Sequence, residues 1–143
     1  MKIVRRGSAA WSGGIKDGKG SVSTESGALN AYPYGFAARF EDQAGTNPEE
    51  LLAATHAGCF TMALSLILGE AGLTADEMKT EAKVTLEKVA DGFEITAVHL
   101  SLTAKVPGAD QAKFEELAAK AKAGCPVSKV LKAKITLDAT LAA

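Results

Sequence analysis

Hydrophobic residues dominate one long stretch of the chain, Leu51 to Leu68, which contains no Asp, Glu, Lys or Arg. Asn47, shortly before it, is a favourable helix N-cap, and Pro48 suits the first helical position. Glycine commonly ends a helix, and two glycines follow the stretch, Gly69 and Gly72. The pattern therefore predicts one helix that begins at Pro48 and ends at one of these glycines.

This helix is apolar on nearly all of its faces, and it is long enough to raise the question of a membrane span. We reject a span because the segment is rich in Ala, carries polar residues such as Thr55, His56 and Ser65, and begins with the cap of a helix in water. A helix that is apolar all round is buried on every side. A chain of 143 residues can hardly enclose it alone, so we expect a second subunit to contribute.

Alternating apolar and polar positions predict the strands. The expected strands are Lys2–Trp11, Gly20–Thr24, Phe36–Glu41, Lys79–Val89, Phe93–Lys105 and Lys134–Leu141. Stretches rich in Gly and Pro separate the first three and predict turns, one of them over residues 30–35. Asp91–Gly92 is a hairpin signal, and a change of apolar phase near Ala97 and Val98 predicts a β-bulge.

Two further helices are expected in the C-terminal part. Asp110 can cap a helix over Gln111–Ala123, and Gly124 can end it. The residues expected on its buried face are Phe114, Leu117, Ala118 and Ala121. Pro126–Lys132 is expected to form a short helix. Since no repeat, linker or low-complexity tract is present, we expect a single domain over residues 1–143, with an α+β fold of mainly antiparallel strands.

Composition and charge narrow the possible functions. The chain is 47% hydrophobic and 23% charged, with a net charge of -1. Its Lys and Arg residues are scattered, so it has no basic patch for nucleic acid. The first residues carry charge without the apolar segment of a signal peptide, and we therefore expect a cytoplasmic protein. In that reducing compartment, Cys59 and Cys125 are more often catalytic, redox-sensing or metal-binding than a permanent disulfide.

The two cysteines have different local surroundings. Cys125 precedes Pro126 and is expected at a helix N-cap, where the partial positive charge of the helix lowers a thiol pKa. It can equally stand in for a Ser cap. Cys59 is in the middle of the long helix, where apolar surroundings raise its pKa unless a cation lies nearby. Local physics alone therefore favours Cys125 as the nucleophile.

Arg39 is the candidate cation, on the expected strand Phe36–Glu41, although an arginine that simply faces solvent is the commoner case. Glu50 follows Asn47 by three residues and has a structural role as a cap partner, whereas Glu49 has none. About ten residues of helix, roughly 15 Å, separate Glu49 from Cys59. Glu49 could serve a thiol in a partner chain or act through a bend in the helix, although a surface carboxylate at a helix start is the commoner case.

His56 lies one helical turn before Cys59 and on the same face. It could be a base, a metal ligand or a core histidine, of which the last is the commonest. The chain has two His and two Cys residues and no close pair of the CxxC kind, so a zinc site is only weakly supported.

Six segments carry the most distinctive motifs of the chain. They are Gly18–Gly27, Pro33–Phe36, Gly45–Leu51, Cys59–Ser65, Leu68–Gly72 and Lys120–Ser128. Together they resemble the OsmC/Ohr family of thiol-dependent peroxidases over essentially the full length. Arg39 resembles the OsmC branch, whereas the Ohr branch carries its active-site arginine in the earlier glycine-rich loop, where this chain has Lys16, Asp17 and Lys19.

The resemblance implies an OsmC-like fold, with mainly antiparallel sheets around a long buried central helix, in an intertwined homodimer with active sites at the interface. It implies that Cys59 is the peroxidatic and Cys125 the resolving cysteine. Arg39 would stabilise the Cys59 thiolate, and Glu49 would orient Arg39. These roles reverse the ranking of the thiols by local physics, because a desolvated arginine close to sulfur can outweigh burial.

The implied reaction reduces a hydroperoxide to an alcohol through a Cys59 sulfenic acid and a Cys59–Cys125 disulfide, which an external dithiol reopens. It needs no metal, haem or flavin cofactor and involves no nucleic acid or membrane. Apolar surroundings favour organic hydroperoxides. Two alternatives stay open. A hydrophobic-ligand-binding module would consume no thiol, and a redox sensor would be oxidised once but recycled poorly by small dithiols.

Overall fold

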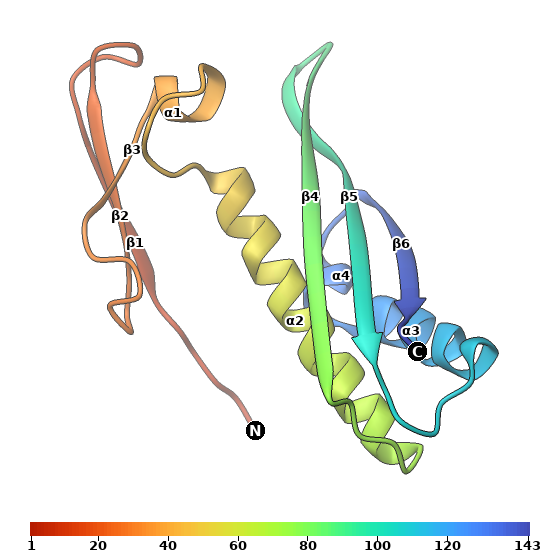
Figure 1. Ribbon diagram of the computed structural model, residues 1–143. Helices are drawn as coiled ribbons and strands as arrows, with labels where there is room; N and C mark the ends of the chain where they lie inside the picture. The colour runs from red at the N-terminus through yellow and green to blue at the C-terminus, as the bar shows by residue number, and fades with distance from the viewer. The chain divides into compact units, whose positions relative to one another are not determined.

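The computed structural model describes all residues, 1–143, and has the predicted α+β composition. The chain forms two compact units, Met1–Leu51 and Leu52–Ala143, which we describe one after the other (Figure 1). The structure contains two three-stranded sheets, β1–β2–β3 and β4–β5–β6.

The sheet of the first unit is antiparallel. β1 (Gly7–Ser12) begins later than predicted, β2 (Lys19–Thr24) agrees with its prediction, and β3 (Tyr32–Tyr34) forms in a stretch predicted to be a turn. Pro33 is tolerated in β3 because this is an edge strand, where a missing N–H need not break the pairing.

The prediction of a strand over Phe36–Glu41 is wrong, because Phe36–Phe40 forms the short helix α1. The Arg39 N–H donates to the Gly35 carbonyl at 3.1 Å, in the helical pattern. The rings of Phe36 and Phe40 lie one turn apart with centroids 5.0 Å from each other. In a strand these residues would be about 13 Å apart. A stretch of five residues, two of them alanines, is too short for its apolar pattern to distinguish the helical period from the strand period.

Helix α2 spans Pro48–Glu70, as predicted. The Glu50 N–H donates to Asn47 Oδ1 at 2.8 Å, which confirms Asn47 as the capping residue. The expected return bond differs, since the Glu50 carboxylate accepts a hydrogen bond from the Thr46 hydroxyl at 2.7 Å. Glu50 therefore supports the helix start through the residue before the cap. Gly72, with a φ of 75°, follows the helix in the left-handed region.

Within this chain α2 has one buried face. Its buried residues recur every four positions and are His56, Phe60, Leu64 and Leu68. On another face, Met62 and Leu66 are 78% and 66% exposed. The chain alone does not bury this helix on every side, and the contribution of a second subunit stays a prediction.

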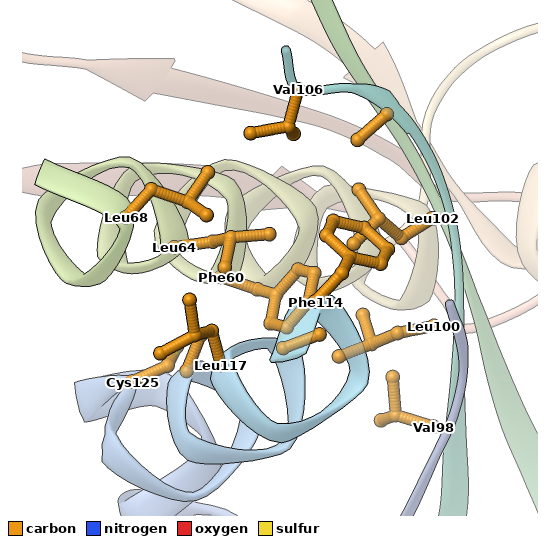
Figure 2. Close-up of a cluster of buried hydrophobic side chains, with 13 residues drawn as sticks. Phe60, Leu64, Leu68, Val98, Leu100, Leu102, Val106, Phe114, Leu117 and Cys125 are labelled. Carbon is orange, nitrogen blue, oxygen red and sulfur yellow. The ribbon is translucent and has the colours of Figure 1, made fainter. Parts of the chain in front are cut away.

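By length and composition alone, α2 is also apolar enough to cross a membrane. The buried helix of a globular core meets the same criteria. We keep the interpretation as a core helix because Phe60, Leu64 and Leu68 pack in the main hydrophobic core (Figure 2).

The second sheet consists of β4 (Glu77–Val89), β5 (Gly92–Lys105) and β6 (Lys134–Leu141), close to the predicted ranges. The hairpin between β4 and β5 is confirmed, since Val89 pairs with Gly92. The predicted bulge is also confirmed, because the register shifts between Thr85 and Leu86, and Thr85 pairs with Ala97. β6 pairs in parallel with β5.

Helices α3 (Gln111–Gly124) and α4 (Pro126–Val130) follow the predicted boundaries, except that α4 ends two residues early. Asp110 caps α3 by accepting a hydrogen bond from the Lys113 N–H at 2.7 Å. The four residues predicted for the buried face of α3 are all buried, and they join residues of α2 and β5 in the core, together with Cys125 (Figure 2).

Candidate active site

The two thiols of the chain are in contact although they lie 66 positions apart in sequence. Both cysteines are reduced, and the Cys125 thiol donates a hydrogen bond to Cys59 Sγ at 2.8 Å. A disulfide bond is about 2.05 Å long, so the two sulfurs need to approach by less than about 1 Å to form one. The pair can therefore be oxidised with little movement of the backbone.

Cys125 lies at the junction of two helices, as the C-cap of α3 and the N-cap of α4. Its N–H donates to the Ala121 carbonyl at 2.9 Å, and its carbonyl accepts from the Lys129 N–H at 3.1 Å. Its thiol makes no cap hydrogen bond, unlike a serine in that place. The predicted position is confirmed, but the side chain is directed to Cys59 instead of to α4.

A backbone group that sequence analysis missed also reaches Cys59. The N–H of Val127, the second residue of α4, bonds to the Cys59 sulfur and lowers the pKa of that thiol. Burial acts in the opposite direction and is the larger effect, and the hydrogen bond from Cys125 adds to it, so the pKa of Cys59 is raised overall. Within this unit, the thiol still requires a further positive charge to become a good nucleophile.

A sequence signal for this donor existed. The first N–H groups of a helix have no partner inside the helix, and Cys125 does not cap α4 with its side chain. An acceptor outside the helix is therefore to be expected, and the partly buried Cys59 provides it through its sulfur.

His56 is fully buried on α2, and its Nε2 lies 2.8 Å from the Ser128 hydroxyl oxygen on α4. Burial lowers its pKa and so favours the neutral imidazole. Its Nδ1 has no hydrogen-bond partner. Of the roles considered for His56, the geometry favours a buried structural histidine. No group of three His, Cys, Asp or Glu side chains lies close enough to hold a metal ion.

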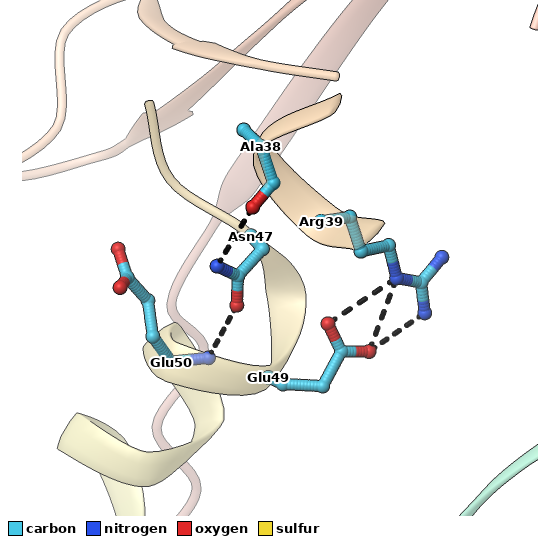
Figure 3. A network of polar contacts seen from close by, with 5 residues as sticks. All are labelled: Ala38, Arg39, Asn47, Glu49 and Glu50. Atoms are coloured by element: carbon cyan, nitrogen blue, oxygen red, sulfur yellow. Dashed lines mark hydrogen bonds and ion pairs between the residues drawn. The ribbon is translucent and has the colours of Figure 1, made fainter. Parts of the chain in front are cut away.

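Arg39 and Glu49 form a close ion pair in the first unit (Figure 3). Nη2 of Arg39 lies 2.7 Å from Glu49 Oε1, and Nε lies 3.2 Å from both carboxylate oxygens. The Arg39 side chain is 37% exposed and that of Glu49 12% exposed. Since Glu49 occupies Nε and Nη2, the guanidinium keeps Nη1 for another partner.

Local contacts around the start of α2 position this pair. Asn47 Nδ2 donates to the Ala38 carbonyl at 3.4 Å, while its Oδ1 caps α2, so one side chain joins α1 to the start of α2 (Figure 3). Arg39 follows Ala38, and Glu49 lies in the first turn of α2. The short helix α1, rather than the predicted strand, thus directs Arg39 at Glu49.

An aromatic cavity of about 340 Å³ adjoins Arg39. It is lined by Trp11, Ile15, Tyr34, Gly35, Phe36, Arg39 and Phe40. The Trp11 and Tyr34 rings meet edge to face with centroids 5.6 Å apart. Gly20 permits this contact, because a Cβ there would lie 2.6 Å from a ring carbon of each. The cavity thus places apolar side chains next to one positively charged group, the Arg39 guanidinium.

Comparison with known proteins identifies the family. The family model described as OsmC-like protein matches residues 40–140. The chain belongs to the OsmC-like family. It is 59% identical over 138 residues to Peroxiredoxin OsmC of Escherichia coli strain K12, with 96% of each chain covered.

More distant OsmC-like relatives carry names of the Ohr branch. The chain is 34% identical over 99 residues to the Organic hydroperoxide resistance protein of Xanthomonas axonopodis pv. citri, covering 68% of each. The crystal structure of the Organic Hydroperoxide Resistance Protein OhrB of Bacillus subtilis superposes with a TM-score of 0.68 at 27% identity, covering 96% of this chain and 98% of that one. The predicted family, OsmC-like fold and peroxidase class are confirmed.

In this OsmC-like chain, Cys59 meets Cys125 in the second unit, and Arg39 meets Glu49 in the first. The structure brings together the members of each pair. The predicted action of Arg39 on the Cys59 thiolate stays a prediction.

Proposed function

We propose that the chain reduces organic hydroperoxides to alcohols, with Cys59 as the peroxidatic and Cys125 as the resolving thiol. The observation that carries the proposal is the contact of 2.8 Å between the two sulfurs. Two reduced cysteines in contact do not cross-link the chain, whereas a two-step thiol peroxidase uses such a pair to form a disulfide after the first oxidation.

In the first step, the Cys59 thiolate attacks the distal oxygen of the hydroperoxide. The O–O bond breaks, the alkoxide takes up a proton and leaves as an alcohol, and Cys59 becomes a sulfenic acid, oxidised by two electrons. In the second step, the Cys125 sulfur attacks the Cys59 sulfur, and hydroxide leaves as water after protonation. An external dithiol then returns two electrons by thiol–disulfide exchange.

Arg39 supplies the positive charge that Cys59 needs. Burial raises the pKa of Cys59, and the Val127 N–H offsets this only in part. A guanidinium near the sulfur favours the thiolate, and its planar fork can hold Glu49 on one edge and the sulfur or the peroxide on another. Glu49 therefore orients Arg39, within the chain or across the dimer.

The cavity beside Arg39 supports a preference for organic hydroperoxides. Trp11, Phe36 and Phe40 line it, and an alkyl or aryl group bound there would be removed from water. Each buried methylene contributes about 0.8 kcal/mol. Hydrogen peroxide has no such group and gains nothing from these walls. The proposal places the reaction in the cytoplasm, where dithiol reductants are available.

Turnover with a small dithiol tests the function. With dithiothreitol as the reductant, we expect cumene hydroperoxide to be consumed catalytically, with a kcat/KM at least about tenfold above that for hydrogen peroxide. The two alternatives predict other results. A ligand-binding module consumes neither peroxide nor thiol, and a redox sensor consumes one equivalent and then stops.

The active form is a homodimer. Thr46 is the single buried residue of Met1–Leu51, so this unit has no hydrophobic core of its own. On α2, the exposed side chains Met62 and Leu66 lie on an uncharged face that includes Gly58 and Gly69. A second copy of the chain carries the same apolar surfaces. An intertwined dimer would bury the apolar face of α2 and the uncovered apolar side chains of Met1–Leu51.

The dimer should persist at low concentration, since its separation would expose the apolar face of α2. We expect equilibrium sedimentation to give a dimer mass down to nanomolar protein. Met62→Glu should cause dissociation, unfolding or both, whereas Lys79→Glu, at an exposed position of β4, should not. A folded, stable monomer of the unmodified chain would contradict the inference.

A further inference from the structure

We propose that His56 and Ser128 form a positioning pair that holds helix α4 against α2, so that the Val127 N–H and the Cys125 thiol stay on the Cys59 sulfur. This inference rests on the proposed function, because it assigns the pair a role in the two thiol steps. We call His56 and Ser128 positioning residues because the contact between them involves neither reacting sulfur. They act on the sulfurs through the placement of α4.

The geometry places this contact beside the chemistry. His56 lies one turn before Cys59 on α2, and Ser128 directly follows Val127 on α4. The distance of 2.8 Å between His56 Nε2 and Ser128 Oγ therefore ties the two helices together next to both thiols. The residues are 72 positions apart, so the bond fixes a non-local arrangement.

Helix α4 needs such an anchor. It has five residues and no side-chain cap hydrogen bond at its start. Helices of this length are not stable alone in water. The Val127 N–H on α4 acts on Cys59, and so does the thiol of Cys125, the N-cap of α4. Loosening α4 would withdraw both at once.

The protonation state of His56 fits this role. A neutral imidazole that carries its proton on Nε2 donates to Ser128 and leaves Nδ1 with a lone pair. An unpaired acceptor at Nδ1 is the lesser cost, because the other tautomer would bury an N–H without a partner. Burying a histidine with an unsatisfied nitrogen costs more free energy than burying an apolar residue. The anchoring role explains why a histidine is present at this position.

Peroxide attack and disulfide closure should each respond to loss of the His56–Ser128 contact, and the two responses can be measured separately. The Val127 N–H lowers the pKa of Cys59 and the Cys125 hydrogen bond raises it, so the losses of these two contacts oppose each other in the wild type. In a Cys125→Ser background, loss of the Val127 N–H alone should raise the pKa of Cys59 and slow attack on the peroxide. Without a fixed Cys125, disulfide closure should slow and the sulfenic acid should live longer, which exposes it to further oxidation to sulfinic acid. A purely structural role would lower the melting temperature and change neither quantity.

Stopped-flow oxidation of the full-length protein with cumene hydroperoxide tests this inference. Ser128→Ala and His56→Leu each remove the bond, and we expect disulfide closure to slow by about tenfold in both, with more sulfinic acid at Cys59. In a Cys125→Ser background, each should also raise the Cys59 pKa measured by thiolate absorbance. Ser128→Thr keeps the hydroxyl and should restore the closure rate.

A matched control is available on the second sheet. His99 Nδ1 lies 2.6 Å from the Thr136 hydroxyl, so Thr136→Ala removes a histidine–hydroxyl contact that joins β5 to β6 and involves neither α2 nor α4. We expect it to leave closure unchanged. If one anchor variant fails to fold, the other decides. Unchanged closure and pKa in a folded anchor variant would overturn the inference, whereas a wild type that does not react with hydroperoxide would overturn the proposed function itself.

Discussion

Replacing Cys59 by Ser is expected to reduce hydroperoxide turnover by at least about a thousandfold. The serine hydroxyl is not ionised at neutral pH and cannot take up the peroxide oxygen as sulfur does. Cys125→Ser should lose turnover that depends on the disulfide but keep the first oxidation step, in which one equivalent of hydroperoxide is consumed. Peroxide loss measured with and without dithiothreitol separates the two variants.

The serine variants are well matched because each replaces one sulfur atom of the same contacting pair by oxygen. Cys59 and Cys125 both contact the hydrophobic core, so equal melting temperatures would show that lost activity is not lost folding. A Cys59→Ser protein that still turned over through Cys125 would support the ranking by local physics, which favours the cysteine at the helix N-cap. It would reverse the proposed roles.

Arg39→Ala is expected to raise the Cys59 pKa and to slow peroxide attack by about a hundredfold. Burial and the Cys125 hydrogen bond raise this pKa, and the Val127 N–H alone does not compensate for them. Arg39→Lys should recover only part of the rate, because an ammonium group keeps the charge but not the planar fork. Thiolate absorbance against pH, in a Cys125→Ser background, isolates the titration of Cys59.

The neighbouring acidic residues supply matched controls for Arg39. Glu49→Gln should cause a smaller loss of rate than Arg39→Ala, since it removes the ion pair of 2.7 Å but leaves the guanidinium. Glu50→Gln should mainly lower stability, because Glu50 bonds to Thr46 at the start of α2. An unchanged Cys59 pKa in Arg39→Ala would move the activating cation elsewhere. Lys16, whose Nζ lies 5.8 Å from the Phe36 ring centroid, and Lys19 would be the next candidates.

Sequence patterns predicted the elements whose periodicity extends over many residues. The buried face of α3 was predicted residue by residue, since Phe114, Leu117, Ala118 and Ala121 repeat with the helical period. The bulge in the second hairpin was predicted from a break in alternation next to Ala97. The start of α2 followed from Asn47, whose side chain accepts from a backbone N–H as expected.

The errors occur where a pattern is short or a contact is non-local. Phe36–Phe40 is too short to distinguish a helix from a strand by period, and the packing of Phe36 on Phe40 decides it. The contact of Val127 with Cys59 and that of His56 with Ser128 join segments far apart in sequence. The local pattern indicates that the Val127 N–H needs an acceptor outside α4, but it does not identify Cys59 as that acceptor. It gives no sign of the His56 contact, because both contacts depend on how α4 packs against α2. Cys59 and Cys125 were paired from family resemblance and not from spacing.

Peptide mapping after treatment with one equivalent of cumene hydroperoxide shows whether Cys59 is the peroxidatic and Cys125 the resolving thiol. For the wild type, we expect an intramolecular disulfide between Cys59 and Cys125. For Cys125→Ser treated in the presence of dimedone, we expect a dimedone adduct on Cys59. A disulfide that joins two chains, two thiols that stay reduced, or a sulfenic acid found on Cys125 of Cys59→Ser at the wild-type rate would contradict these roles.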